Sequence, residues 1–231
     1  MAAAALGAIL AVGCADGSGD ADGPAADAAG TSSTAVATPS PTPQPTPRPS
    51  PRPARTPKPH TPAPVVAAGA TMPPAIVVNA GPVYAVGDSV TLDIANPLRA
   101  DVPGVVVDGQ VGRQFSVGIS IIAGLRSAGR LPPMVIVALG TNGTVTAQQI
   151  DQMMSAATGA RRVVFVTVHV PRVWQDSDNA VIRAGVTRYP NAGLADWNAL
   201  SAGHPAWFAP DGYHLSTTGA TALARLIAAA L

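Results

Sequence analysis

A serine in the middle of the chain lies in a sequence that is typical of a nucleophile. Ser89 ends the tripeptide Gly87-Asp88-Ser89, which follows the apolar run 82–86 and precedes a helix-like stretch over residues 90–98. At such a turn the hydroxyl is exposed at the carboxyl end of a strand, and the serine N–H, at a helix start, can face developing negative charge. An ordinary helix cap is the alternative for a lone Gly-Asp-Ser. The assignment therefore depends on residues elsewhere in the chain.

A histidine near the end of the chain could act as the general base for this serine. His214 follows Asp211 by three residues and stands just before a predicted C-terminal helix over residues 217–230. In a helical turn these two side chains share a face, so the carboxylate can hold the imidazole Nδ1–H while Nε2 accepts the serine proton. The alternative is that Asp211 only caps the turn and that His214 is an ordinary surface residue.

The histidines do not form a metal-binding pattern. His169, His204 and His214 could be grouped with Asp211, but no paired ligand spacing is present. The pattern also predicts that His169 lies inside an apolar strand. We therefore expect no metal and no other cofactor.

The elements that must position these residues alternate between short apolar runs and longer helical stretches. Strands are expected at residues 83–86, 105–107, 134–139, 163–168 and 194–197, and helices at 90–98, 115–127, 147–158, 180–188 and 217–230. Continuous apolar strands separated by helices predict a parallel sheet covered on both faces. We expect a three-layer α/β/α fold with five strands in the flavodoxin-like order 2-1-3-4-5.

Polar turns follow each of the first three predicted strands. They comprise residues 87–89, 108–113 and 140–143. In open α/β sheets, ligands bind beyond the carboxyl ends of the strands, near the point where strand order reverses. The expected order makes these three strands neighbours, so their turns would meet in one crevice. Each turn taken singly could be ordinary glycine turn chemistry, but three in succession indicate a functional site.

The sequence before the folded part is typical of export and tethering. Residues 1–14 form an apolar, signal-like segment that ends in Cys14, the only cysteine, in a lipobox-like context. Residues 15–38 are rich in Ala, Gly and Asp and are expected to be disordered. Residues 39–74 predict an extended tether, because half of the 24 prolines lie between Pro39 and Pro64. Residues 75–231 form the predicted catalytic domain.

Lipidation of Cys14 would place the protein in the cell envelope, at the outer face of the plasma membrane. A plain secreted protein is the alternative. Contact with the membrane is then expected only through this lipid anchor.

The charge balance argues against nucleic-acid binding. The formal net charge is +1, and four of the 14 basic residues lie in the tether. Aromatic residues make up only 4% of the chain, which leaves few stacking platforms for bases. We therefore expect no nucleic-acid partner.

Taken in order, the motifs of the folded part resemble those of the SGNH (GDSL-like) hydrolase family. More narrowly, they resemble the extracellular catalytic domain of the peptidoglycan O-acetyltransferase A type. The likeness covers residues 84–231 and is carried by residues 87–90 (GDSV), 108–114 (DGQVGRQ), 139–143 (LGTNG), 170–172 (VPR), 196–197 (DW), 201–204 (SAGH) and 208–215 (FAPDGYHL).

This resemblance implies roles for individual residues. Ser89 would be the nucleophile, His214 the base and then the acid, and Asp211 the residue that orients His214. The oxyanion hole would consist of the backbone N–H groups of Ser89 and Gly112 together with the side-chain amide of Asn142. Gly112 is chosen because it lies further beyond its strand than the glycine at position 109.

Three further residues are candidates for substrate binding. Arg172 and Trp174 follow the fourth strand and could line the crevice and contact a glycan. An exposed arginine beside a loop tryptophan is the alternative. Arg113 could contact substrate or could instead bond nearby carbonyl groups and be structural.

The resemblance also implies an activity, that of an exported serine esterase or O-acyltransferase acting on O-acetyl groups of cell-wall glycan or another acylated carbohydrate. In the transferase family the domain is joined to a membrane module that supplies acetyl groups, and no comparable stretch is found in this sequence. A separate membrane protein would then deliver the acyl group, or water would accept it. The alternative is a tethered module that binds glycan without catalysis.

Overall fold

One parallel β-sheet organises the part of the chain that the computed structural model describes, residues 71–231. Its five strands run in the order β2-β1-β3-β4-β5, and all neighbouring pairs are parallel. The strands are β1 (Val83–Gly87), β2 (Val106–Gly109), β3 (Met134–Ala138), β4 (Arg162–Val166) and β5 (Ala192–Ala195). The predicted strand number and order are confirmed.

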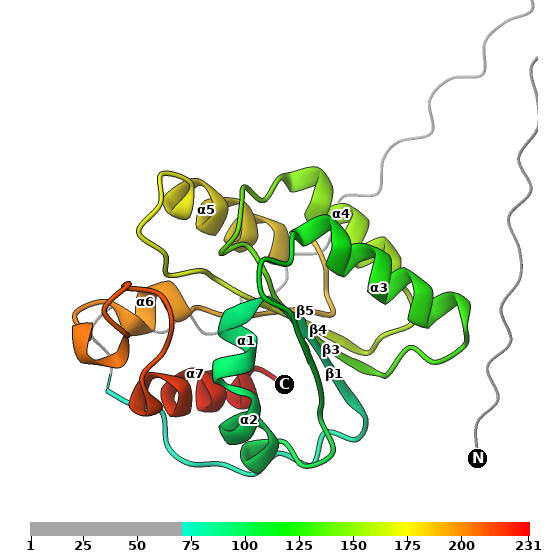
Figure 1. Ribbon diagram of the computed structural model, residues 1–231. Helices are drawn as coiled ribbons and strands as arrows, with labels where there is room; N and C mark the ends of the chain where they lie inside the picture. Colours follow the sequence, from blue (N-terminus) through cyan, green and yellow to red (C-terminus); the bar gives the residue numbers. More distant parts are fainter. Residues whose placement is uncertain (1–70) are drawn as a thin grey trace, which may run out of the picture. The chain divides into compact units, whose positions relative to one another are not determined.

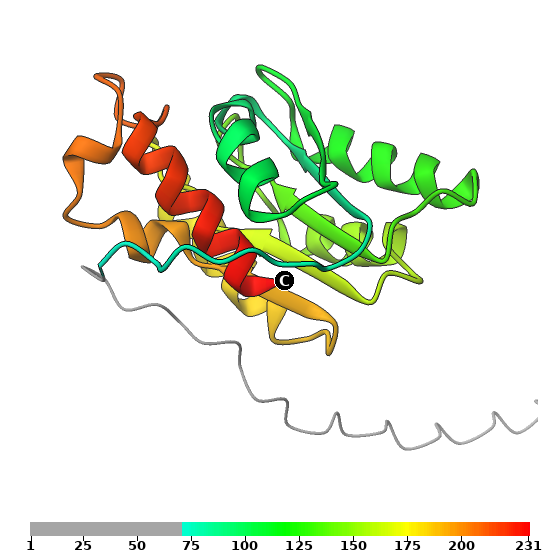
Figure 2. The ribbon, with the colours of Figure 1, turned by 90° about the horizontal axis from the view of Figure 1, so that it is seen from below.

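Helices cover both faces of the sheet, as Figure 1 shows. One face carries α3 (Phe115–Ser127), α4 (Ala147–Ala156) and α5 (Gln175–Val186). The other carries α1 (Ser89–Asp93), α2 (Ala95–Asp101), α6 (Trp197–Ser201) and α7 (Thr217–Ala230), and a 3₁₀ turn (Pro205–Trp207) follows α6. Figure 2 shows α7, in red, lying lengthwise beside the strands. The predicted three-layer α/β/α fold is confirmed.

The hydrophobic core is divided by the sheet into two clusters. Ile122 of α3, Ile150 of α4 and the β-branched residues of β3 belong to one cluster. Leu98 of α2 and Leu223 of α7 belong to the other. Strands that are covered on both faces read as continuous apolar runs, which explains why the sequence pattern predicts β1, β3 and β4 so clearly.

Three predicted elements differ from the structure for identifiable reasons. The helix expected at residues 90–98 is two helices, α1 and α2, which meet at Ile94. The helix expected at 180–188 begins earlier, at Gln175. Its first turns are polar and show no apolar periodicity, so the sequence pattern did not predict them. The acidic residues in the first turn suit a helix N-terminus. The strand expected at 194–197 ends at Ala195, and Trp197 starts α6.

The segment that leads into β1 is packed against the domain. Met72 and Val78 contact the core cluster beside α7, and the Val78 N–H donates to the Asp101 carbonyl at 2.8 Å. Arg225 of α7 donates to the Pro73 carbonyl at 3.2 Å. The end of the expected tether, residues 71–74, is therefore already in contact with the folded part.

Residues 1–38, including Cys14, and most of the expected tether lie outside the described residues, so the expectations for them stay predictions. Within residues 71–231, no helix has the length and apolar character needed to cross a membrane.

Candidate active site

The end of β1 and the start of α1 place Ser89 at the carboxyl edge of the sheet. Ser89 is the first residue of α1 and is 7% exposed. The turn requires glycine at position 87, because a Cβ there would overlap Thr91 Oγ1 and would lie 2.7 Å from the Ala138 carbonyl oxygen. The close packing of α1 against β3 therefore fixes the direction in which the serine side chain leaves the sheet.

Asp88 is buried beneath this serine and joins two of the polar turns. It is 1% exposed, its Oδ1 accepts the Val90 N–H at 3.1 Å, and its Oδ2 accepts the Thr141 N–H at 3.3 Å. Burial raises the pKa of Asp88, and these hydrogen bonds oppose that rise. Asp88 is thus the helix cap that the sequence offered as an alternative, and it also links the turn after β1 to the turn after β3.

His214 and Asp211 lie in a turn between the 3₁₀ helix and α7. The His214 Nδ1 is 2.7 Å from Asp211 Oδ2, and Asp211 Oδ1 accepts the N–H groups of Tyr213 and His214 at 3.1 and 3.0 Å. The hydrogen bond from His214 is the main cause of a lowered pKa at Asp211. The carboxylate therefore stays ionised and holds the imidazole by its Nδ1 side.

The serine turn and the histidine turn meet although they are 125 residues apart in sequence. His214 Nε2 lies 3.0 Å from Ser89 Oγ, which is a hydrogen-bond distance. Asp211 rather than Asp88 is the partner of this histidine, because the His214 Nδ1 is bonded to Asp211 Oδ2, whereas the Asp88 oxygens accept backbone N–H groups. The structure thus brings Ser89, His214 and Asp211 into one hydrogen-bonded chain, which is the arrangement that lets a serine hydroxyl lose its proton to a base.

A carboxylate that the sequence motifs do not include holds the histidine turn in place. Asp93, the last residue of α1, accepts the N–H of Leu215 at 3.0 Å. The short helix α1 therefore carries the serine at one end and the anchor of the histidine turn at the other. A spacing of four from Ser89, which puts both on one helix face, is the signal that could have identified Asp93.

Two of the expected oxyanion donors lie in the polar turns that follow β2 and β3. Asn142 lies in the turn after β3, and its Nδ2 is buried without a hydrogen-bond partner among the described residues. Gly112 lies in the turn between β2 and α3, with φ of 74°. Gln114 Nε2 donates to the carbonyl oxygens of Asn142 and Gly112, at 2.9 and 3.4 Å, and so joins these two turns. The three polar turns expected to converge do converge.

Comparisons with known proteins agree with this geometry. No known family profile matches the chain. The peptidoglycan O-acetyltransferase OatA of Listeria monocytogenes is 38% identical over 62% of this chain and 23% of its own length. The O-acetyltransferase OatA of Staphylococcus aureus is 36% identical over 62% of this chain and 24% of its own length. The chain thus spans about a quarter of the length of these relatives.

Solved structures show the same fold. The C-terminal catalytic domain of Streptococcus pneumoniae OatA has a TM-score of 0.60 at 24% identity and covers 68% of this chain and 93% of that one. An acetyl xylan esterase from Geobacillus stearothermophilus has a TM-score of 0.52 at 14% identity, over 65% and 94%. The resemblance to SGNH hydrolases is confirmed. The described domain is homologous to part of the peptidoglycan O-acetyltransferases.

In this domain Arg113 is structural. It is 6% exposed, and its guanidinium donates to the Gly87 and Asp108 carbonyl oxygens at 3.1 and 2.5 Å. It also pairs with the Asp108 carboxylate at 2.8 Å, which helps to lower the pKa of Asp108, and Tyr84 donates to the same carboxylate. Of the two interpretations offered by the sequence, substrate contact or carbonyl bonding, the structure favours the second.

Trp174 and Arg172 lie on the segment between β4 and α5. The Trp174 indole N–H donates to the Gly140 carbonyl at 3.2 Å, which holds the tryptophan beside the turn that carries Asn142. Arg172 is exposed, and among residues 71–231 its guanidinium donates only to the Pro171 carbonyl. Trp174 is thus close to the site, whereas Arg172 is not tied to it.

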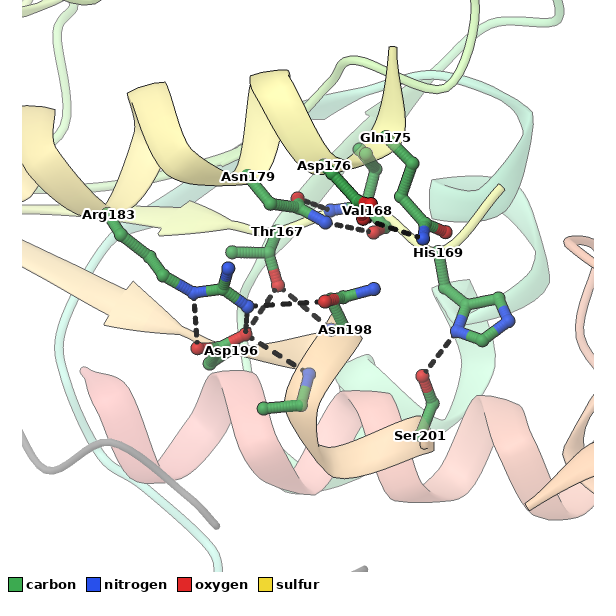
Figure 3. A network of polar contacts seen from close by, with 11 residues as sticks. Thr167, Val168, His169, Gln175, Asp176, Asn179, Arg183, Asp196, Asn198 and Ser201 are labelled. Carbon is green, nitrogen blue, oxygen red and sulfur yellow. Dashed lines mark hydrogen bonds and ion pairs between the residues drawn. The ribbon is translucent and has the colours of Figure 1, made fainter. Parts of the chain in front are cut away.

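His169 does not lie inside a strand, as the sequence pattern suggested. Strand β4 ends at Val166. Beyond it, the Val168 N–H donates to Asn179 Oδ1 of α5, and Asn179 Nδ2 donates to the Val168 carbonyl, each at 2.8 Å. His169 therefore reaches the carboxyl edge of the SGNH sheet, where Ser201 contacts its ring (Figure 3). Within residues 71–231, no three His, Cys, Asp or Glu side chains are grouped so that they could hold a metal ion.

Proposed function

We propose that this protein is a serine-dependent O-acetyl esterase or O-acetyltransferase that acts on cell-wall glycan. The observation that carries the proposal is the hydrogen-bonded chain from Ser89 through His214 to Asp211. The glycan substrate is inferred from homologues that are named peptidoglycan O-acetyltransferases. An esterase or transferase of this kind needs no cofactor, because the nucleophile, the base and the oxyanion donors are all protein groups.

In the first half of the reaction, Ser89 Oγ attacks the carbonyl carbon of an acetyl ester. His214 Nε2 takes the hydroxyl proton, and the ionised Asp211 stabilises the imidazolium through its Nδ1–H. The carbonyl π electrons move to the oxygen, which becomes an oxyanion. When the tetrahedral intermediate collapses, the C–O bond to the donor breaks, and the leaving alcohol takes the proton from His214. An acetyl group then remains on Ser89.

The oxyanion would be bound by the backbone N–H groups of Ser89 and Gly112 and by the Asn142 amide. The Nδ2 of Asn142 is buried and has no acceptor within residues 71–231, which supports this role because a buried donor without an acceptor costs free energy that a bound oxyanion can recover. The N–H of Ser89 points from the start of a helix, where the helix dipole favours negative charge.

In the second half, an acceptor hydroxyl loses its proton to His214 and attacks the acetyl-enzyme. If the acceptor is water, acetate is released and the protein is an esterase. If the acceptor is a sugar hydroxyl, a new O-acetyl group is formed and the protein is a transferase, with a separate membrane protein as the source of the acetyl group. Trp174 and Arg172 are proposed to contact the glycan from the segment before α5.

We further infer that the protein is exported, with Cys14 as a lipid anchor at the outer face of the plasma membrane. A cell-wall substrate and the signal-like segment that ends in the single cysteine support this location. Mass spectrometry of the protein isolated from its membrane fraction tests it. An N-terminal peptide that begins at an acylated Cys14 is expected, and an unmodified thiol at that position would contradict the anchor.

The activity is tested with the full chain and an activated aryl acetate. Wild type should release the aryl alcohol, and the intact protein should gain the mass of one acetyl group when the reaction is quenched early. Ser89→Ala should show neither product.

Equal product release by wild type and Ser89→Ala would refute the proposal. Retention of glycan by both proteins, with no acetyl-enzyme in either, would favour the non-catalytic binding module instead.

A further inference from the structure

A cavity lies beside the turn that carries Asp211 of the proposed catalytic centre. Its volume is about 390 Å³, and its lining includes His169, Ser201, His204, Phe208, Pro210 and Gly212. Pro210 and Gly212 are the residues that flank Asp211 in sequence. The cavity and the Ser89–His214–Asp211 chain thus share one turn, although neither Ser89 nor His214 lines the cavity.

The lining of this cavity is suited to an uncharged ligand. No Asp, Glu, Lys or Arg is among the residues that line it. Two stacked ring pairs border it, His169 on Phe208 with centroids 4.2 Å apart and His204 on Trp207 at 3.9 Å. A cavity of this volume that combines aromatic surface with a few placed polar groups is typical of a small-molecule site.

His169 supplies an oriented hydrogen-bonding group in this cavity. Its Nδ1 lies 2.9 Å from the hydroxyl of Ser201, which is 1% exposed (Figure 3). Burial lowers the pKa of His169, so the ring is neutral near pH 7. The Ser201 hydroxyl has no other acceptor among the described residues, and a buried O–H without an acceptor is costly. The hydroxyl therefore donates to Nδ1, and the proton of the neutral imidazole is on Nε2.

The Nε2–H of His169 makes no hydrogen bond to another described residue. Figure 3 shows this nitrogen on the side of the ring that points away from Ser201. Nothing in the chemistry of the Ser89 acyl transfer uses this donor, because His214 and Asp211 supply both the base and its partner. A fixed, neutral N–H donor beside aromatic surface remains to be explained.

We propose that this cavity is a binding subsite for a neutral sugar unit that neighbours the acetylated unit in the glycan chain. The Nε2–H of His169 donates to a hydroxyl or amide oxygen of that sugar, and the Phe208 and His204 rings contact its apolar face. This inference rests on the proposed function for the choice of a glycan, but the binding step itself requires no catalysis. A second subsite would hold a polymeric substrate across the Asp211 turn.

The experiment measures binding in the full chain that carries Ser89→Ala, so that no turnover occurs. The probe is a tetramer of β-1,4-linked N-acetylglucosamine, with a tetramer of galacturonic acid as the charged control. His169→Phe keeps the ring and its stacking on Phe208 but removes both nitrogens. Ser120→Ala, which removes an exposed hydroxyl from α3, is the matched control.

We expect His169→Phe to weaken binding of the neutral tetramer about 3- to 10-fold, the value of one neutral hydrogen bond. Ser201→Ala should weaken it about 2-fold, because the ring stays but its tautomer is no longer fixed. Ser120→Ala should have no effect, and the acidic tetramer should bind more weakly than the neutral one. Equal affinity in all three variants, or tighter binding of the acidic tetramer, would overturn the proposal.

A second measurement does not depend on how the variants fold. In the imidazole ¹⁵N spectrum of the Ser89→Ala protein, His169 should show a protonated Nε2, and its signals should shift when the neutral tetramer saturates the protein. Unchanged His169 signals at saturation, or a proton on Nδ1, would contradict the subsite. Because the readout is binding, it can succeed even if the aryl acetate assay fails, and the two proposals can fail separately.

Discussion

The serine and the histidine of the site are held in contrasting ways. Ser89 and Asp88 are 7% and 1% exposed and are built into the end of a central strand. The side chains of His214 and Asp211 are 33% and 41% exposed and lie on a turn that has no regular secondary structure. The nucleophile is positioned by burial and close packing, whereas the base is positioned by individual hydrogen bonds.

The two carboxylates of the site, Asp88 and Asp211, show the same contrast. Burial raises the pKa of Asp88, whose oxygens accept backbone N–H groups. Asp211 is solvated, and its hydrogen bond from His214 lowers its pKa. Asp88 therefore serves the structure of the serine turn, and Asp211 serves the imidazole. Substitutions in the two regions should accordingly differ in whether they affect folding or turnover.

The largest effect is expected when either end of the Ser–His pair is removed. Ser89→Ala and His214→Ala should each lower kcat on an aryl acetate by about 10⁴-fold or more, because neither group can act alone. The double variant should be no slower than the single ones. A double variant that is slower by the product of the two effects would show that the residues act independently, contrary to the hydrogen bond between them.

A smaller loss is expected from the oxyanion donor. Asn142→Ala should lower kcat by about 10²- to 10³-fold, the usual effect of removing one such donor. Thermal unfolding should change little, because the lost Nδ2 has no partner among the described residues. A large drop in the unfolding temperature together with unchanged kcat would contradict the assignment of this amide to the oxyanion.

The same substitution in the two regions should separate packing from turn geometry. Gly87→Ala places a methyl group against Thr91 and the Ala138 carbonyl, so it should destabilise the fold by about 3 kcal/mol or more. Gly212→Ala lies beside Asp211 at φ 79° with only Pro171 nearby, and it should cost about 1 kcal/mol. Denaturant unfolding measures both. Equal losses of unfolding free energy in the two variants would contradict the proposed difference in packing between the two regions.

The anchor of the histidine turn should have a modest effect on turnover. Asp93→Ala leaves the Leu215 N–H without its acceptor, and we expect kcat to fall about 10-fold because His214 is held less well. Asp93→Asn retains an acceptor oxygen and should recover most of that loss. If the two variants were equally slow, the carboxylate charge rather than the hydrogen bond would be responsible.

The smallest expected effect concerns stability and pH. Burial lowers the pKa of His169, so the folded state binds fewer protons at this residue than the unfolded state. Its contribution to stability is therefore full above the ordinary histidine pKa of about 6.5 and is lost as pH falls below it. His169→Phe should have a shallower decline in unfolding free energy between about pH 7 and about pH 5. An identical decline in both proteins would show that other groups cause it.

The fold could be predicted because its strands are buried on both sides. The β-branched runs of β1, β3 and β4 and the amphipathic helices α3 and α7 carry strong local patterns. The break at Ile94 and the early start of α5 could not be predicted in the same way. They depend on packing against distant segments, such as the bonds of Asn179 to Val168.

The sequence also located the three residues that the structure joins at 3.0 and 2.7 Å, because each lies in a short motif with its own chemistry. The motifs did not include Asp93, whose spacing of four from Ser89 is informative only once α1 is known to be a helix, and they did not indicate the bridging role of Gln114. It left open whether Arg113 binds substrate, because its carbonyl partners become visible only when the register of β1 and β2 is known. The sequence therefore predicted the residues that could react, whereas it did not predict the contacts that hold those residues in position.

The solvent exposure of the His214 turn has a consequence for the size of the molecules that can react. An insoluble polymer cannot enter a deep tunnel, but it can approach a base that stands at the rim of the protein. In the proposed reaction, the same exposure of His214 would let water compete with a sugar hydroxyl as the acceptor. In that reaction, transfer would exceed hydrolysis only while a bulky acceptor shields the imidazole from solvent. Tight binding of the polymer would then determine whether the product is a new O-acetyl group or free acetate.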